Sequence, residues 1–164
     1  MKKILLISMV LFVASVACKK ENVGGGGLCA CSPVQVPSLN LVIKNSAGTD
    51  LLSDKTTGYY NKSKIEVNRR DAAGKVTAVD FAIRPPFAYG NEKFMYNQLY
   101  IPVSFLQTTD NLIYLKLGNG KTYKLKIVLN QDKYTLNKLL IDDQEAVKDN
   151  GNVAKYATVF YLTE

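Results

Sequence analysis

Hydrophobic and polar residues alternate along most of the chain that follows residue 38. At the start of this region, Leu39, Leu41 and Ile43 alternate with the polar residues Asn40 and Lys44. The same period of two recurs in three later series: Thr77, Val79, Phe81 and Ile83; Met95, Leu99, Ile101, Val103 and Phe105; and Tyr156, Thr158, Phe160 and Leu162. This period is typical of β-strands that bury one face. We therefore predict short strands, each directing an apolar side at a core.

Turn-forming residues separate these series: Ser46–Gly48, Asp71–Gly74, Gly90-Asn91, Asp110-Asn111 and Asp149–Asn152. About seven or eight strands at this spacing predict an all-β fold, an antiparallel, immunoglobulin-like β-sandwich, with a barrel as the alternative. Pro102 interrupts its series and predicts an edge strand or a bulge. Only Leu136–Val147 has a pattern that could also form a helix.

One hairpin can be predicted in detail. Two strand-like segments flank a glycine-rich turn: Leu112–Leu117, Gly118–Gly120 and Lys121–Leu129. A two-residue loop would pair Leu115 with Lys124, whereas a three-residue loop pairs Leu115 with Tyr123 and keeps apolar residues on one face. We therefore predict the three-residue loop, with Gly120 as the left-handed residue of a bulge.

The first 17 residues have the organisation of a secretory signal. Two lysines precede Ile4–Val13, a mostly apolar segment too short to cross a hydrocarbon core of about 30 Å as a helix. Small or modest residues then lead directly to Cys18. We predict cleavage before Cys18 and attachment of acyl chains, palmitate among them, at that residue. Ser15 stands where lipoprotein signals usually carry Leu, so the alternative is an ordinary signal peptide cleaved near Ala17.

This reading divides the chain into three parts: a signal peptide over 1–17, a lipidated flexible tether over 18–37 and a β-sandwich domain over 38–164. The four glycines Gly24–Gly27 are typical of flexible coil. The domain is thus expected to work outside the cytoplasm, at the end of a membrane-anchored tether.

Several segments resemble small outer-membrane lipoproteins of Bacteroidetes. The resemblance covers about residues 1–70 and rests on four segments: Cys18-Lys19-Lys20-Glu21, Cys29-Ala30-Cys31-Ser32-Pro33, Leu39–Leu52 and Tyr60–Ile65. It implies a lipid-anchored location at the outer membrane, on either the periplasmic or the cell-surface side. The resemblance therefore indicates where the protein is located and does not indicate an activity.

The charge of the chain narrows the choice of partners. The formal charge is +7, and removal of the two lysines in residues 1–17 lowers it to +5. An exported, tethered chain of this charge is expected to meet the membrane, an envelope protein or an anionic glycan, and not nucleic acid. The positive charge also disfavours an inhibitor of basic host lysozymes.

Cys29 and Cys31 are the other cysteines. In an oxidising compartment we expect them to form a strained disulfide, with free thiols as the second reading. The chain has no histidine, and nothing near the pair completes a metal site. We therefore expect neither a metal nor a cofactor.

The predicted hairpin carries the most organised polar feature of the sequence. The face opposite its apolar side holds Tyr114, Lys116, Thr122, Lys124 and Lys126. Tyr114 and the three lysines could bind an anionic glycan or lipid, or they could be an ordinary solvated face. Tyrosines near predicted loops or strand ends could also build a binding surface: Tyr59, Tyr60, Tyr89, Tyr96 and Tyr100, with Phe87 among them.

Catalysis has little support in the sequence. Without histidine there is no Ser-His-Asp or Cys-His arrangement, so we predict no catalytic residues. The leading hypothesis is a non-enzymatic envelope lipoprotein with a binding or scaffolding domain. The alternative is an envelope glycan hydrolase that uses a carboxylate pair drawn from Asp80, Glu92, Asp110, Asp142, Asp143 and Glu145.

Overall fold

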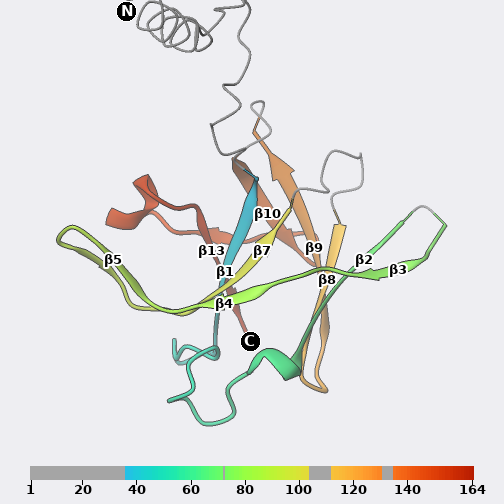
Figure 1. The fold of residues 1–164 in the computed structure, drawn as a ribbon, viewed down its shortest axis with the longest axis horizontal. Coiled ribbons are helices and arrows are strands. Elements are labelled where there is room, and N and C mark those ends of the chain that lie inside the picture. Colours follow the sequence, from blue (N-terminus) through green and yellow to red (C-terminus); the bar gives the residue numbers. More distant parts are fainter. Residues whose placement is uncertain (1–35, 72, 104–111, 131–134) are drawn as a thin grey trace, which may run out of the picture. The chain divides into compact units, whose positions relative to one another are not determined.

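The computed structural model describes residues 36–71, 73–103, 112–130 and 135–164 (Figure 1). These residues form strands and two short 3-10 helices, η1 (Lys62–Lys64) and η2 (Asn152–Lys155). The prediction of an all-β sandwich is confirmed. The described part contains thirteen strands, more than the predicted seven or eight, because several predicted strands are split and short hairpins are added. Within this part the strand pairing does not close into a barrel.

One layer is a five-stranded sheet. Its order is β12 (Val147–Lys148), β13 (Val159–Thr163), β1 (Ser38–Lys44), β7 (Gln98–Pro102) and β4 (Ala82–Arg84). β1 and β13 run parallel, which is an exception to the antiparallel pattern that we expected. β1 lies in the middle of the sheet and is buried on both faces, so it is not the half-buried strand that its alternation predicts.

The other layer is a six-stranded sheet. Its order is β11 (Gln144–Glu145), β10 (Leu136–Ile141), β9 (Thr122–Leu129), β8 (Leu112–Leu117), β2 (Ile65–Arg70) and β3 (Val76–Ala78). The segment that could have formed a helix, Leu136–Val147, is therefore strand and turn. Asp142 and Asp143 both have positive φ and make the tight two-residue turn between β10 and β11.

The β8–β9 hairpin has the predicted register. Leu115 pairs with Tyr123, as the three-residue loop requires. The glycine prediction is wrong: Gly118 has the left-handed conformation, with φ +56°, whereas Gly120 does not. The turn instead closes with a hydrogen bond of 3.0 Å from the Gly120 N–H to the Leu117 carbonyl. The left-handed residue thus comes first in the loop rather than last.

The main core lies between the two sheets. Alternate residues of β1, β7, β8, β9 and β13 supply it, and its largest fully buried side chains include Phe160, Leu39, Leu115 and Leu125. At about 25 cal/mol per Å² of buried apolar surface, this interior supplies most of the driving force for folding. The inward direction predicted from the alternation is correct for Leu99 and Ile101 of β7, for Val103 directly after β7, and for Phe160 and Leu162 of β13. It fails for Met95 and Tyr156, which lie outside the strands and are exposed.

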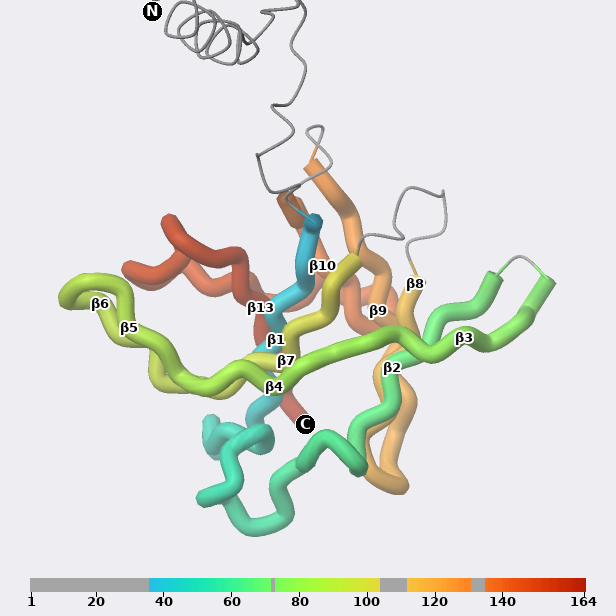
Figure 2. The backbone as a smooth tube through the Cα atoms, in the orientation of Figure 1, coloured from blue at the N-terminus to red at the C-terminus, as the bar shows by residue number. Residues whose placement is uncertain are grey.

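Continuous segments link the two sheets along their edges. Thr77–Ile83, predicted as one strand, is divided: β3 belongs to the six-stranded sheet and β4 to the five-stranded sheet. Figure 2 shows this segment crossing the molecule as one extended tube. At the opposite edges, β11 leads directly into β12. The two connections, from β3 to β4 and from β11 to β12, therefore place short strands along both edges of the main core.

Pro102 does not mark an edge strand, because β7 lies between β1 and β4. β4 pairs only with Gln98–Tyr100, so no strand flanks Pro102 on that side. Proline, which lacks an N–H donor, is tolerated at the strand end for this reason.

A second, smaller core covers part of the outer face of the five-stranded sheet. A hairpin of β5 (Phe87–Tyr89) and β6 (Glu92–Phe94), called the arm below, projects from the sandwich (Figure 1). Its Phe94 packs with Val42 and Val159 of the sheet and with Val153 of η2. The arm and η2 therefore cover apolar residues that β1 and β13 direct away from the main core.

Candidate binding site

The predicted lysine face exists as a geometric feature. Tyr114 lies opposite Lys124, and Lys116 lies opposite Thr122, on the outer side of the six-stranded sheet. Lys126 is exposed further along β9. The hairpin therefore brings all five predicted residues to one face.

Acidic side chains from other strands compensate two of these lysines. Lys116 Nζ lies 2.9 Å from Glu66 Oε1 on β2, and Lys124 Nζ lies 3.2 Å from Asp143 Oδ1 in the β10–β11 turn. Arg70 stacks over the Tyr114 ring at 5.0 Å from its centroid. Among the described residues Lys126 alone of the three lysines has no ion-pair partner. Two of the three lysines on this face are thus neutralised by acids.

The acids considered for a hydrolase lie in different surroundings. Asp142 pairs with Lys121 and accepts the Lys124 N–H at 2.9 Å, and both interactions hold the pKa of Asp142 below its usual value. A lowered pKa favours the ionised carboxylate, the opposite of what a general acid needs. Glu145 pairs with Lys138 at 2.7 Å, and Glu92 accepts a hydrogen bond of 2.9 Å from Asn152.

Asp80 is exposed, and Asp110 lies outside the described residues. Within the described ranges, no group of three or more Cys, Asp or Glu side chains is placed to hold a metal ion. Cys18, Cys29 and Cys31 also fall outside those ranges, so lipidation and the disulfide remain predictions.

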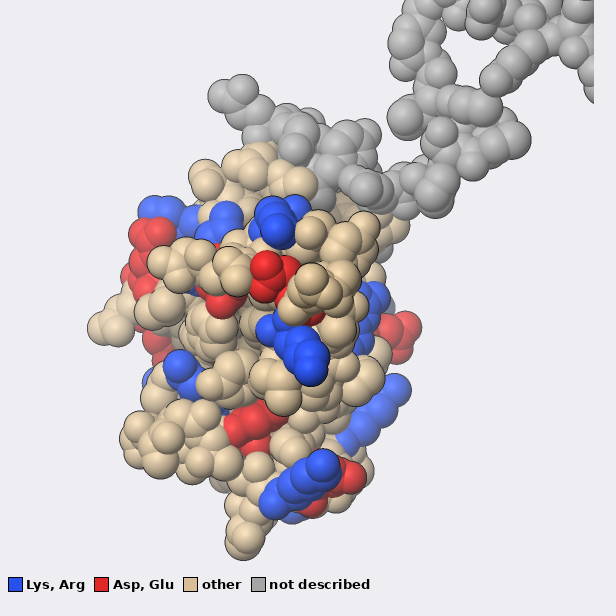
Figure 3. All heavy atoms as spheres, turned by 90° about the vertical axis from the view of Figure 1, so that its left-hand side faces the viewer, with Lys and Arg blue, Asp and Glu red and all other residues tan. Residues whose placement is uncertain are grey.

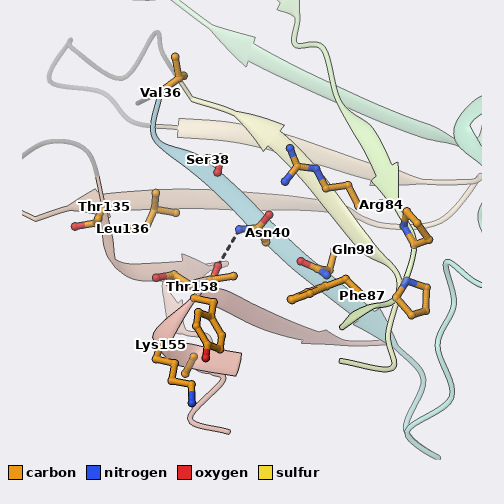
Figure 4. Close-up of a pocket in the computed structure, with 15 residues that line it drawn as sticks. Val36, Ser38, Asn40, Arg84, Phe87, Gln98, Thr135, Leu136, Lys155 and Thr158 are labelled. Carbon is orange, nitrogen blue, oxygen red and sulfur yellow. Dashed lines mark hydrogen bonds between the residues drawn. The ribbon is translucent and has the colours of Figure 1, made fainter. Parts of the chain in front are cut away.

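A pocket of about 730 Å³ opens on the outer face of the five-stranded sheet, beside the small core (Figure 4). Ser38 and Asn40 of β1 and Gln98 of β7 form its floor. Side chains alternate along a strand, and the neighbours Leu39, Leu41 and Leu99 point into the main core. The three floor residues therefore point away from that core.

Two chain segments make the walls. On one side, Pro85 and Pro86 separate β4 from the arm and carry the chain away from the sheet, between Arg84 and Phe87. Two consecutive prolines cannot donate to a strand ladder, so β4 ends there. On the other side, 154–158 runs from the end of η2 toward β13 and contributes Lys155 and Tyr156.

Two carboxamides are buried at the pocket floor, although neither belongs to the main core. Asn40 is 8% exposed, and its Nδ2 donates a hydrogen bond of 3.0 Å to the Thr158 carbonyl. Gln98 is 3% exposed, yet its carboxamide makes no hydrogen bond to another described residue. A buried polar group without a partner costs about 1–3 kcal/mol, so a ligand that hydrogen-bonds to the Gln98 carboxamide would offset this cost.

The charged residues of the pocket are cations. Arg84 and Lys155 stand on opposite sides of it, and the described lining residues include no Asp or Glu (Figure 4). The Arg84 guanidinium lies over the Tyr100 ring at 3.3 Å from the centroid. Neither cation forms an ion pair with a described acid. The pocket thus combines neutral amides with two positive charges that no described acid compensates.

Aromatic residues extend the pocket toward the arm. Phe87 and Tyr156 line it, and Tyr156 also packs against Tyr89 with ring centroids 4.0 Å apart. The sequence pattern predicts Phe87, Tyr89 and Tyr96 as surface candidates, but it does not indicate Gln98, Arg84 or Lys155. One signal was available: Asn40 and Gln98 are amides beside the most apolar stretches of the chain.

Comparison with protein-family models, with curated proteins and with solved structures gave no match to this chain. In the part of the chain that the structure describes, no helix is long and apolar enough to cross a membrane.

Proposed function

We propose that this chain is a lipid-anchored protein of the outer membrane whose β-sandwich binds a ligand, without catalysis, in the pocket beneath the arm. The observation that carries the binding function is the buried Gln98 carboxamide, which has no partner among the described residues and lines a pocket of about 730 Å³. That volume is typical of small-molecule sites.

The pocket is preferred over the lysine face of the hairpin as the binding site. On the hairpin, Glu66 and Asp143 already neutralise Lys116 and Lys124. In the pocket, Arg84 and Lys155 pair with no acid among the described residues, and the buried amides Asn40 and Gln98 lie beside them. A ligand gains more from hydrogen bonds to amides that are already desolvated than from lysines that are already paired with acids.

The proposed location at the outer membrane is supported by features of the amino-acid sequence. The signal-like residues 1–17, the following Cys18 and the glycine-rich tether support lipid anchoring, and the segments that resemble Bacteroidetes lipoproteins support the outer membrane. Growth with labelled palmitate tests this: the wild-type chain should become labelled, and Cys18→Ala should not. Labelling of Cys18→Ala would contradict it. Protease added to intact cells then separates the periplasmic from the surface orientation.

Filling the pocket tests the binding function. Ser38→Trp places a large ring at the pocket floor, whereas Ser46→Trp places the same ring in an exposed turn and serves as the matched control. A ligand that binds the folded state raises Tm according to its concentration relative to Kd. Fractions of bacterial envelope extract should raise the Tm of wild type and Ser46→Trp but not of Ser38→Trp. An equal rise in all three, or no rise in wild type, would refute the proposal.

A further inference from the structure

We infer that the pocket beneath the arm binds an acidic saccharide, in which a sugar ring carries a carboxylate. The inference rests on the proposed binding function and names its ligand class. Three properties of the pocket support it: its charge, its neutral hydrogen-bonding groups and its aromatic walls.

The charge of the pocket selects an anion. Arg84 comes from the end of β4 and Lys155 from η2, so two segments distant in sequence bring positive charge to the same pocket. The Arg84 guanidinium stacks on Tyr100, which leaves the N–H groups at its rim available to a carboxylate. Figure 3 shows the side of the molecule that lies on the left in Figure 1, where blue and red side chains are interspersed among uncharged surface. Selection for an anion therefore depends on the pocket and not on a general basic surface.

The floor of the pocket selects hydroxyl groups. A carboxamide offers two N–H donors and an acceptor oxygen, and a sugar hydroxyl can both donate and accept. With respect to the described residues, all of these groups are unused on Gln98, and on Asn40 the Oδ1 acceptor and one N–H remain after the bond to Thr158. A simple anion would satisfy the cations but would leave the amide oxygens without a donor.

The walls provide flat apolar surface. Phe87 and Tyr156 line the pocket, and the side chain of Tyr156 is 45% exposed. Pyranose rings have apolar C–H faces that pack against such aromatic rings, whereas the flexible backbone of an acidic peptide does not present a comparable flat face. Together with the amide floor, this favours a sugar over a peptide as the source of the carboxylate.

Calorimetry on the full chain in detergent tests the inference with three matched probes: trigalacturonate, neutral galactotriose and triglutamate. Trigalacturonate should bind, and the other two should bind at least about ten-fold more weakly, because each lacks one half of the recognised chemistry. Equal binding of triglutamate would overturn the saccharide class, and equal binding of galactotriose would overturn the acidic class.

Variants assign the binding to the pocket. Arg84→Gln and Gln98→Met should each weaken trigalacturonate binding by about ten-fold or more. Lys126→Gln removes an uncompensated lysine from the opposite sheet and should leave binding unchanged. A loss in Lys126→Gln equal to that in Arg84→Gln would overturn the assignment.

The inference and the proposed function can fail separately. If trigalacturonate does not bind but envelope fractions still raise the Tm of wild type and not of Ser38→Trp, the ligand class is wrong and the binding site stands. If no fraction raises Tm, both are wrong.

Discussion

The outer faces of the two sheets carry polar residues of different kinds, and among the described residues the five-stranded sheet is the one whose outer face holds buried amides beside a pocket. On the six-stranded sheet, Lys116 and Lys124 are partly exposed and are paired with acids from neighbouring segments. On the five-stranded sheet, Asn40 and Gln98 are buried beside a pocket whose cations form no ion pair within the described ranges. Partly exposed ion pairs such as those of Lys116 and Lys124 change the free energy of unfolding little. A buried amide that has no partner among the described residues lowers it.

The largest expected difference between the faces concerns their aromatic residues. Phe94→Ala removes a side chain that is 5% exposed and packed with Phe87 at 5.5 Å between ring centroids. Its removal should lower the free energy of unfolding by about 3 kcal/mol or more, because the small core loses its largest contact. Tyr114→Ala on the other face loses mainly the stacking with Arg70, which contributes about 0.5–1 kcal/mol.

Urea unfolding of the two variants measures this difference. Equal losses would mean that the arm contributes no more to stability than an exposed ring does. Hydrogen exchange should further show that Phe94→Ala loses protection in the arm, at residues 87–94, before it loses protection in β8 and β9.

A substitution at the pocket floor should raise the free energy of unfolding, whereas Phe94→Ala lowers it. Gln98→Met keeps the length of the side chain but removes the buried carboxamide, so the ligand-free protein should become more stable by about 1–2 kcal/mol. Asn40→Leu is the control, because its amide donates to the Thr158 carbonyl. That variant should lose about 1–3 kcal/mol, since a carbonyl is left without its donor. Destabilisation by both substitutions would show that Gln98 is satisfied in the folded protein and would weaken the argument for the pocket.

A third prediction concerns Tyr161, on the outer face of β13. Burial and a hydrogen bond of 2.7 Å from its hydroxyl to Asp149 Oδ1 raise the pKa of Tyr161 above its usual value. A raised pKa means that the folded state holds the proton more tightly, so this contribution is complete below about pH 10 and is lost as the pH rises further. Tyr161→Phe should therefore cost about 1 kcal/mol at neutral pH.

The alkaline behaviour of this variant separates the hydrogen bond from packing. The stability of wild type should fall more steeply above about pH 10 than that of Tyr161→Phe, and the two curves should converge. Chemical denaturation at a series of pH values measures both slopes. Parallel curves would mean that the tyrosine proton does not contribute.

Much of the fold follows from local patterns in the sequence. The period of two predicted the sandwich, and the matching parity of Leu115 and Tyr123 predicted the hairpin register. Parity could not reveal that β1 is covered on both faces, because the covering arm is assembled from residues far along the chain. The division of β3 from β4 was missed for a related reason: the same alternation continues while the strand changes sheets.

The candidate site was harder to predict than the fold. The lysines of the hairpin were visible because they alternate within one short segment, but their partners Glu66 and Asp143 come from other strands. The pocket joins β1, β4, β7, the start of β10 and 154–158, so no local spacing links Gln98 to Lys155. Its one local signal was an amide beside apolar residues, which sequence alone reads as a solvent-facing position.

The smallest expected change in the free energy of unfolding concerns the lysine face of the β8–β9 hairpin. Glu66→Gln leaves Lys116 without the acid that now lies 2.9 Å away, on a surface where both side chains are more than a third exposed. The loss in free energy of unfolding should be below about 1 kcal/mol and should vanish at about 1 M salt, where charges are screened within about 3 Å. Lys126→Gln, which breaks no ion pair with a described residue, should have no measurable effect.

Glu66→Gln also tests whether positive charge alone is sufficient for binding trigalacturonate. Glu66→Gln adds one net positive charge to a face that already holds Tyr114, Lys116 and Lys124, yet it creates no concave floor and no buried amide. Binding of trigalacturonate to this face should therefore stay weak and should disappear with added salt. Binding at the pocket should lose less of its strength under the same conditions, because the buried amides Asn40 and Gln98 contribute hydrogen bonds that salt does not screen. If Glu66→Gln bound as tightly as the pocket does, charge and not burial would distinguish the two faces.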